Sequence, residues 1–530
     1  MLNKIINSFV LNQLDYKILT TSKRAYDESL DPLDRALTAM QKFDRMSESE
    51  VVTPKKVCED MVKLLPEEGL RAIVDKKEKF LDLGCKAGEY AVALYNRLRE
   101  ELGYTHEEVR DLIYAIPTSN IAYEFTRKFY EILGLNIDNI ATKFNAYDLL
   151  DIKNEKDEID YEKIKNILEQ DKKFSKIDLK EKVKAGGRKV NFGAVVGNPP
   201  YQEIISTSKG NKSLGKQLFP EFIKISVEAT DRFSSLVTPS KWFTADAQDN
   251  SFPKLREYFR DNNNFTSMHV ITDGSKIFHG IGLGSVNYFV YDKNYSGDVE
   301  FSSDSELSVV KRPLFEKEMT QIIPLNSMVS VLNKVITHKD FVSITTITNG
   351  RNAFGLTGKE AEELTTEECN GDCFEVRCSY ERIRYIKKDK INKNVDLVNK
   401  YKIFMSKANG AAGVLGTNDQ VAILGKPYIG EKGTLCTDSL IPIGDFSSMV
   451  EAENLALYIK TKFLRYMVGI LKSSHNLYQV VYRFVPMQDF TNNSDIDWSK
   501  SIDEIDEQLF DKYELSEEER NIIKNSIKDL

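Results

Sequence analysis

The stretch Lys79-Phe80-Leu81-Asp82-Leu83-Gly84-Cys85-Lys86-Ala87-Gly88-Glu89 decides the fold. Its first five residues predict a short strand, the glycines predict a turn, and a helix is predicted from Tyr90 to Leu102. Glycines between a strand and a helix let a ligand approach the backbone closely, and the helix N-terminus favours negative groups. Asp82, at the strand end, could balance a cationic or amino group. The G-x-G-x-x-G spacing of dinucleotide sites is absent, and a tight turn without a ligand is the alternative interpretation.

Strands and helices alternate along the chain on both sides of this stretch. Thr53 is expected to be the N-cap of the first helix, with Pro54 at its first position. Alternating strands and helices predict a mostly parallel sheet with helices on both faces, an α/β fold. Strands are predicted over residues 79–83, 112–116, 140–144, 194–196, 234–238 and 285–291, and helices over 54–65, 90–102, 121–133, 220–229 and 255–262.

The length of 530 residues allows two or more domains, each with its own core. Residues 1–49 are polar with a helical pattern and predict a helical extension without catalytic groups. The alternating pattern covers residues 50–300. Beyond about residue 300 the chain changes to short strands, glycine turns and, at its end, acidic helices. We therefore predict a separate mixed α+β domain over residues 301–530.

The composition is that of an ordinary globular protein, with 41% hydrophobic and 29% charged residues. No apolar run approaches the roughly 20 residues of a membrane span, and the N-terminus lacks a signal-peptide core. We therefore expect a cytoplasmic protein without a membrane partner. Six cysteines in this length predict no disulfide framework. Cys369, Cys373 and Cys378 fit no standard zinc spacing, so we expect reduced surface thiols there and no metal.

The net charge of −8 does not by itself exclude a nucleic-acid partner, because a groove needs only a local basic lining. Two basic stretches are candidates. Residues 172–189 also carry Asp178 and Glu181, which favours a solvated charged face. Residues 382–388 interleave basic and aromatic side chains, so a phosphate contact and a solvated face both stay open for this stretch.

The tetrapeptide Asn198-Pro199-Pro200-Tyr201 follows a predicted buried strand directly. The prolines fix φ and remove two backbone donors, so the carbonyl of Pro199 is held rigidly outward. Asn198 adds a second acceptor, and Tyr201 offers a flat apolar face. The two acceptors can take both hydrogens of an exocyclic NH₂ group while the tyrosine stacks on the ring that carries it. The tetrapeptide therefore predicts a site that holds a planar amino group still.

Asp148 follows the predicted strand over residues 140–144 by a few positions. An acid at that place lies at the carboxyl edge of a parallel sheet, where ligands bind in open α/β folds. A helix cap is the alternative interpretation of the same residue.

The order of Thr53-Pro54, Asp82 to Glu89, Asp148 and Asn198 to Tyr201 resembles the S-adenosylmethionine-dependent N6-adenine DNA methyltransferases of type II restriction–modification systems. Residues 237–243, 284–289 and 484–490 support this resemblance, which covers about residues 50–530. It implies a Rossmann-like methyltransferase core over residues 50–300 and a DNA target-recognition domain with a helical region over 301–530. It also implies double-stranded DNA as partner and leaves room for a separate restriction endonuclease.

The resemblance assigns roles residue by residue. Asn198 and the Pro199 carbonyl would hold the target N6, with Pro200 fixing their geometry and Tyr201 stacking on the base. One of Tyr288, Phe289 and Tyr291 would close the other face of the base, with Phe289 and Tyr291 on one side of their strand. The residues expected to hold S-adenosyl-L-methionine are Thr53, Asp82, Gly84, Gly88, Thr118 and Asp148.

Two positions depart from the family pattern. Lys86 stands where a small residue or glycine is usual, and the second strand ends without the acid that holds the cofactor ribose. Thr118 is expected to substitute for that acid as a weaker hydrogen-bonding group. The predicted reaction is direct methyl transfer to a flipped-out adenine, without a covalent nucleophile. Alternatives are a protein glutamine or RNA adenine methyltransferase, or a catalytically silent DNA-binding specificity subunit.

Overall fold

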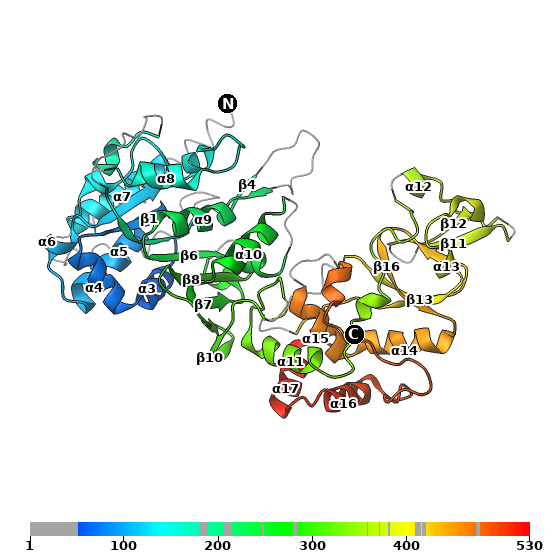
Figure 1. Ribbon diagram of the computed structural model, residues 1–530. Coiled ribbons are helices and arrows are strands. Elements are labelled where there is room, and N and C mark those ends of the chain that lie inside the picture. The colour runs from blue at the N-terminus through cyan, green and yellow to red at the C-terminus, as the bar shows by residue number, and fades with distance from the viewer. Residues whose placement is uncertain are drawn as a thin grey trace, which may run out of the picture. The chain divides into compact units, whose positions relative to one another are not determined.

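The computed structural model divides into two compact units, one ending at Leu314 and one running from Phe315 to Leu530, to which Phe243–Ala245 also belongs (Figure 1). The predicted N-terminal extension and much of the basic stretch 172–189 lie outside the described residues. The structure describes residues 51–530 apart from 171, 180–188, 205–214, 246–248, 279–283, 317–318, 358, 370, 380–381, 409–414, 416–419 and 473–476.

An eight-stranded sheet forms the centre of the first unit. Strands β2, β1, β3 and β6 are parallel neighbours, and only β8 and β10 run against the other strands. The predicted α/β fold with a mostly parallel sheet is confirmed. In sheet order the strands are β10 (Glu306–Arg312), β9 (Val299–Ser303), β7 (Phe265–Ile271), β8 (Val286–Asp292), β6 (Phe233–Pro239), β3 (Phe192–Gly197), β1 (Lys79–Cys85) and β2 (Ile113–Pro117).

Helices cover both faces of this sheet, because successive residues of its central strands point to opposite faces and are apolar on each. Phe80 and Val196 belong to one buried cluster, which α3, α5 and α7 complete. Their chain neighbours Leu81 and Val195 belong to another cluster, which α8 and α9 complete. The helices of this unit are α3 (Lys55–Leu64), α4 (Glu67–Asp75), α5 (Glu89–Asn96), α6 (His106–Val109), α7 (Asn120–Leu133), α8 (Tyr161–Leu168), α9 (Phe219–Ala229) and α10 (Ser251–Asp261).

Two local predictions for this unit are wrong. The strand predicted over residues 140–144 is a single bridge between Ile140 and Ala115, and the chain beyond it exposes Thr142 and Lys143. The first helix begins at Lys55 with Pro54 at its cap, so Thr53 is not the N-cap. The helix predicted over residues 90–102 is confirmed, with α5 (Glu89–Asn96) continuing as the π-helical turn Arg97–Glu101. Strand β7 was not predicted, because its sequence is partly polar.

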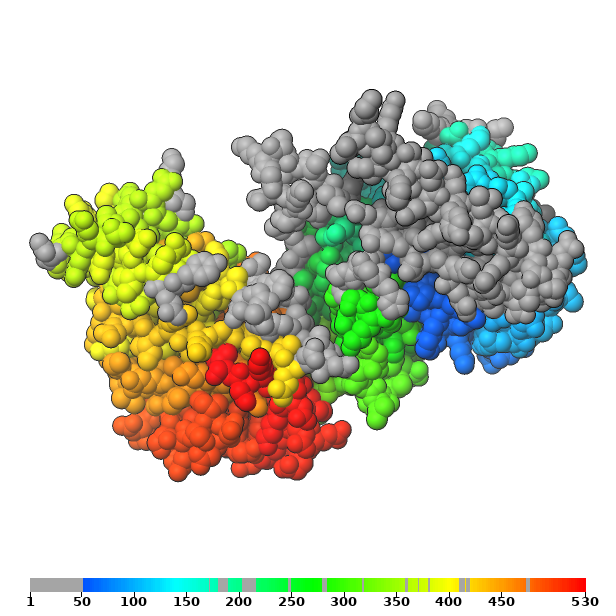
Figure 2. All heavy atoms as spheres, turned by 180° about the vertical axis from the view of Figure 1, so that it is seen from behind, coloured from blue at the N-terminus to red at the C-terminus, as the bar shows by residue number. Residues whose placement is uncertain are grey.

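The second unit combines helices with two three-stranded sheets. Residues 350–400 of this unit appear yellow-green in Figure 2. Its largest buried cluster joins helices α11, α14, α15 and α16 to strands β13 and β16. Its strands are β11 (Cys373–Arg377), β12 (Ile383–Lys387), β13 (Tyr401–Ser406), β14 (Tyr428–Gly430), β15 (Thr434–Cys436) and β16 (Leu440–Phe446), and its helices are α11 (Asn326–Ile336), α12 (Lys359–Glu362), α13 (Val395–Val398), α14 (Met449–Lys460), α15 (Lys462–Leu471), α16 (Ile502–Lys512) and α17 (Glu517–Ser526).

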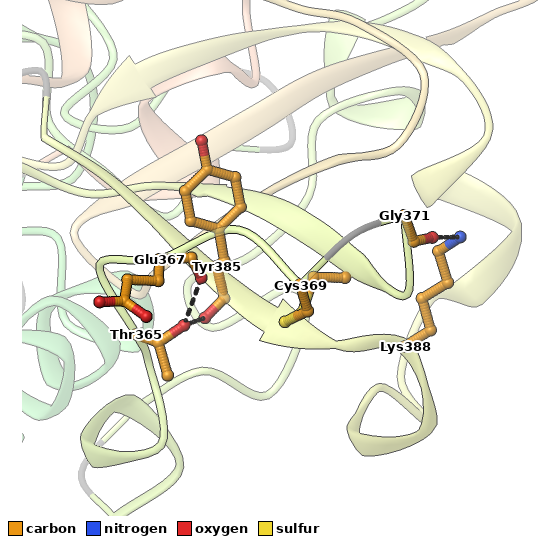
Figure 3. The surroundings of a disulfide bond; sticks show 7 residues. Thr365, Glu367, Cys369, Gly371, Tyr385 and Lys388 are labelled. Atoms are coloured by element: carbon orange, nitrogen blue, oxygen red, sulfur yellow. Dashed lines mark hydrogen bonds between the residues drawn. A yellow bond between two sulfur atoms is a disulfide. The ribbon is translucent and has the colours of Figure 1, made fainter.

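Two of the thiols that we expected to be reduced form a disulfide, Cys369–Cys373, in the turn before β11 (Figure 3). Cys378 stays a free cysteine. Among the described residues, no cluster of three histidine, cysteine or acidic side chains is arranged to hold a metal ion. None of the helices in the described part of the chain combines the length and the apolar character needed to cross a bilayer.

Candidate cofactor and catalytic site

The site begins where the parallel strands β1, β3 and β6 end at the same edge of the sheet. Gly197, the last residue of β3, lies so close to β1 that a Cβ atom there would be 2.3 Å from the Leu83 carbonyl oxygen. A Cβ atom at Gly84 would lie 3.2 Å from the Cα atom of Pro199. The tertiary structure therefore places the glycine turn directly against the tetrapeptide.

The turn after β1 needs glycine for its backbone conformation. Gly84 has a φ of +82° and Gly88, at the N-cap of α5, has a φ of +75°. Other residues pay roughly 1–2 kcal/mol for this left-handed region. The glycines therefore form the tight turn that the sequence predicts between β1 and α5, and the approach of a ligand to this turn stays a prediction.

Glu89, in the first turn of α5, ties Thr53 to this turn. Its buried carboxylate accepts hydrogen bonds from the backbone N–H groups of Thr53 (3.2 Å) and Ala87 (2.8 Å). The structure thus brings Thr53 to the predicted site, although not as a helix cap. Sequence reasoning assigned Glu89 no role. An acid at a helix N-terminus is a common sequence signal, but it does not reveal a partner 36 positions earlier.

Asp82 is fully buried at the end of β1, and neither of its carboxyl oxygens has a hydrogen-bond partner among the described residues. Burial raises the pKa of this carboxyl well above its ordinary value; the negative charge of Glu89 raises the pKa further, and the positive charge of Lys86 opposes the shift. A buried acid without a partner is costly unless a cation or a donor satisfies it. Asp82 therefore fits a ligand that carries an ammonium group.

Lys86 connects the glycine turn to the tetrapeptide. Its buried ammonium group donates a hydrogen bond to the main-chain carbonyl of Asn198, with 2.5 Å between the Nζ and O atoms. The residue that departs from the family pattern therefore holds the backbone of the predicted catalytic motif. When ionised, the carboxylates of Asp82 and Glu89 outnumber this one ammonium group, and the site can accept a further positive charge.

The tetrapeptide itself is buried up to its tyrosine. Asn198 is 4% exposed, and its side-chain amide makes no hydrogen bond within the described part of the chain. Tyr201 is half-buried; its hydroxyl donates a long hydrogen bond to the Val237 carbonyl (3.5 Å), and burial raises its pKa. Its ring meets Phe219 edge-on at 6.4 Å. The acceptor amide and one aromatic face therefore stand together at the end of β3.

Thr118 and Asp148 lie at the same edge, beside β1. The backbone N–H of Thr118 donates to the Cys85 carbonyl (3.1 Å), and that of Ala146 donates to the Pro117 carbonyl (2.9 Å). The Asp148 carboxylate accepts from the backbone N–H of Asn145 (2.8 Å), so it caps a short turn beside the predicted site. Both interpretations of Asp148 are compatible with this position.

The aromatic residues of β8 are buried in the packing of the sheet. Phe289 and Tyr291 both contact Phe265, at 5.1 and 5.3 Å between ring centroids, on one face. Tyr288 contacts His269 on the other face, at 4.7 Å. The predicted alternation of these three side chains is confirmed, whereas their role beside a target base stays a prediction.

Part of the first unit is similar in sequence to a known protein family. Residues 111–278 match the Eco57I restriction-modification methylase family. The matched segment contains Asp148 and the tetrapeptide but not the glycine turn, and it spans less than half of the 530-residue chain. The match identifies a methyltransferase segment of the restriction–modification type. No curated protein sequence matches the chain.

Solved structures that resemble the chain do so weakly. The type IIG restriction endonuclease BpuSI is 12% identical with a TM-score of 0.40, covering 93% of this chain and 68% of its own. The DrdV–DNA complex is 9% identical with a TM-score of 0.46, covering 87% of this chain. A type I restriction-modification methyltransferase subunit from Streptococcus thermophilus is 14% identical with a TM-score of 0.34, covering 59% of this chain. The chain spans 58% of the length of each of the last two.

Proposed function

We propose that this protein is a site-specific DNA methyltransferase that transfers a methyl group from S-adenosyl-L-methionine to N6 of a flipped-out adenine, within a restriction–modification system. The observation that carries the proposal is the placement of Asn198-Pro199-Pro200-Tyr201 against the glycine turn at Gly84, which follows the buried carboxyl of Asp82 along β1. The family match over residues 111–278 supports methyl transfer as the reaction class.

The residues of this site fit the cofactor chemically. Asp82 and the glycine turn offer a carboxylate and close backbone for the cofactor's amino-acid end, and the tied backbone of Thr53 lies beside them. Thr118 and Asp148 stand beside β1 for its nucleoside end. When bound, S-adenosylmethionine supplies an electrophilic methyl group on a sulfonium.

The tetrapeptide supplies the positioning. The adenine N6 lone pair is delocalised into the ring, so the amine is a poor nucleophile. The Asn198 amide and the Pro199 carbonyl can accept its two hydrogens and localise the lone pair towards the methyl donor. Lys86 holds the Asn198 carbonyl and so fixes this peptide against the glycine turn. Positioning and electrostatics account for the rate, and no residue needs to form a covalent bond.

An adenine amino group in a duplex is out of reach of a buried site, so the base has to leave the helix. Extrusion of a base costs a few kcal/mol. Stacking of the base on Tyr201 can offset about 1–3 kcal/mol of that energy, as stacking on aromatic side chains does in other nucleic-acid sites. The edge-on contact with Phe219 helps to fix the orientation of the tyrosine ring.

The test is methyl transfer from labelled cofactor to duplex DNA, RNA and protein in parallel. We expect label in DNA, located by single-molecule mapping at N6 of adenine in one sequence context. Label in protein or RNA would favour the glutamine or RNA methyltransferase alternatives, and DNA binding without transfer would favour a silent specificity subunit.

The variant Asn198→Ala should lose transfer and retain cofactor binding. Asn294→Ala, which changes an exposed asparagine of the same unit, serves as the matched control and should keep full activity. An active Asn198→Ala enzyme would exclude the role that we give to this amide. Co-purification from the native host would show whether a separate restriction endonuclease accompanies the protein.

A further inference from the structure

A basic surface of the second unit takes no part in the site described above. Residues 382–393 contain six basic side chains and a single acid, Asp389, in a chain whose net charge is −8. The side chains of Arg382, Lys387, Lys388, Lys390 and Lys393 are exposed. We name these five residues the basic row. Its charge is opposite in sign to that of the whole protein, so it marks a partner that is itself negative.

Most of the row lacks an acidic partner. Lys387, Lys388 and Lys393 pair with no carboxylate among the described residues. Lys390 pairs with Glu363 at 3.3 Å, but both side chains are about half exposed (52%), so solvent screens that pair and a stronger anion can replace it. The positive charge of these four lysines is therefore available to a ligand.

The backbone beneath the row is held in place. The Lys388 ammonium donates to the Gly371 carbonyl (2.7 Å), beside the Cys369–Cys373 disulfide that closes the turn before β11 (Figure 3). Lys393 donates to the Asn352 carbonyl, also at 2.7 Å. These contacts anchor the segment without neutralising its cations, so the row needs little ordering when it binds.

A cavity of about 350 Å³ lies at the end of the row. Lys390, Lys393 and Asn392 contribute donors to its wall, and the buried side chains of Phe354, Leu356 and Ile386 contribute apolar surface. Glu363, the solvent-screened partner of Lys390, is the one acid among the described lining residues. Amide and ammonium donors around a hollow are the groups that hold phosphate oxygens.

The spacing favours a polymer over a single anion. Arg382 directly precedes the extended strand β12 and Lys387 is its last residue, so five steps at roughly 3.3 Å per residue separate them by about 17 Å. One small phosphate would meet only one or two of these cations. Duplex DNA carries a charge about every 1.7 Å along its axis and so presents several phosphates over the same length.

We propose that the basic row and the adjoining cavity bind the phosphate backbone of double-stranded DNA. The choice of DNA as the polymer rests on the proposed function, whereas the phosphate chemistry does not. The contact is to the backbone, so it positions the duplex without reading its sequence.

The test measures the affinity of the full-length protein for labelled duplex DNA between 50 and 200 mM salt. In the triple variant Lys387→Gln, Lys390→Gln, Lys393→Gln, the magnitude of the slope of log K against log salt should fall by about 2.7, at roughly 0.9 per lost phosphate contact. The matched control Lys339→Gln, Lys426→Gln, Lys500→Gln removes three exposed lysines elsewhere in the same unit and should keep the wild-type slope. Arginine at the three test positions should also keep it.

An unchanged slope in the test variant, or an equal loss in the control, would overturn the proposal. A larger effect on single-stranded RNA than on duplex DNA would overturn the assignment of the polymer. The same experiments in an Asn198→Ala background separate this inference from the proposed function, because binding is then measured without methyl transfer. If the wild type methylates DNA and the triple variant keeps the wild-type slope, only the proposed role of the basic row is refuted. If the triple variant loses slope and the wild type transfers no methyl group to DNA, only the proposed reaction is refuted.

Discussion

Replacement of Asp82 by asparagine is the most informative single change in the proposed cofactor site. The substitution keeps the shape of the side chain and removes its ability to carry a negative charge. This carboxyl is fully buried, neither oxygen has a hydrogen-bond partner in the part of the chain that the structure describes, and burial raises its pKa well above the ordinary value. The folded protein therefore binds the Asp82 proton more tightly than the unfolded chain does.

The sign of the pH dependence follows from that shift. Below the ordinary pKa of an aspartate, Asp82 is protonated in both the folded and the unfolded protein, and its titration costs no stability. As pH rises from there towards the raised pKa, the free energy of unfolding falls by up to about 1.4 kcal/mol per pH unit. The Asp82→Asn variant lacks this loss, so it should become more stable than the wild type as pH rises. A Trp498→Phe background leaves Trp242 as the only tryptophan, and its fluorescence then reports urea unfolding of the first unit.

The same substitution should weaken cofactor binding, although it makes the folded protein more stable at higher pH. A hydrogen bond to a charged group contributes about 1.5–3 kcal/mol, so Asp82→Asn should raise the Kd for S-adenosylmethionine by about 10- to 150-fold. Because a cationic ligand favours the carboxylate, binding to the wild type should release a proton, and calorimetry in buffers of different ionisation enthalpy would detect it. A wild-type Kd in the Asp82→Asn variant, or binding to the wild type without proton release, would refute our reasoning about Asp82.

Three further substitutions test the rest of the site. Gly84→Ala should destabilise the first unit by at least about 1–2 kcal/mol and weaken cofactor binding, since φ is +82° and the new Cβ would lie 3.2 Å from Pro199; thermal unfolding and titration measure both. Lys86→Met should lower kcat by about 10- to 150-fold and leave the cofactor Kd near the wild-type value, with partial rescue by Lys86→Arg, because it frees the Asn198 carbonyl; an equal loss in kcat and cofactor affinity would contradict this. Tyr201→Ala should raise the KM for DNA by about 5- to 150-fold, from a stacking term of about 1–3 kcal/mol, whereas Tyr201→Phe should lose little; equal losses would point to the hydroxyl instead.

The parts of the fold that follow from local sequence were predictable. Strands β1, β3 and β6 are short apolar runs that end at turn residues, and such runs are buried on both faces of a parallel sheet. The stretch 140–144 has a similar composition at its start, but only Ile140 pairs, with Ala115 of β2. Whether such a run becomes a strand depends on a partner along its length, which the sequence does not state.

The site was predictable in its residue types and less so in its contacts. The structure brings all the expected residues to one sheet edge, from Thr53 to Tyr201. Their roles in binding and catalysis stay predictions. The partners of Glu89 and Lys86 were not foreseen, because Lys86 meets a carbonyl 112 positions away and Glu89 meets an amide 36 positions away. Contacts at such separations depend on the order of the strands.

The sequence by itself determined the chemistry of each local piece: glycines that allow positive φ, prolines that fix a carbonyl, and an apolar run that has to be buried. These properties arise within a few bonds of the backbone and need no partner. Only the tertiary structure decided that Lys86 holds the tetrapeptide, that Asp82 is fully buried, and that Cys369 and Cys373 form a disulfide. The physical reason is that burial, charge and pairing depend on which distant segments fold against each residue.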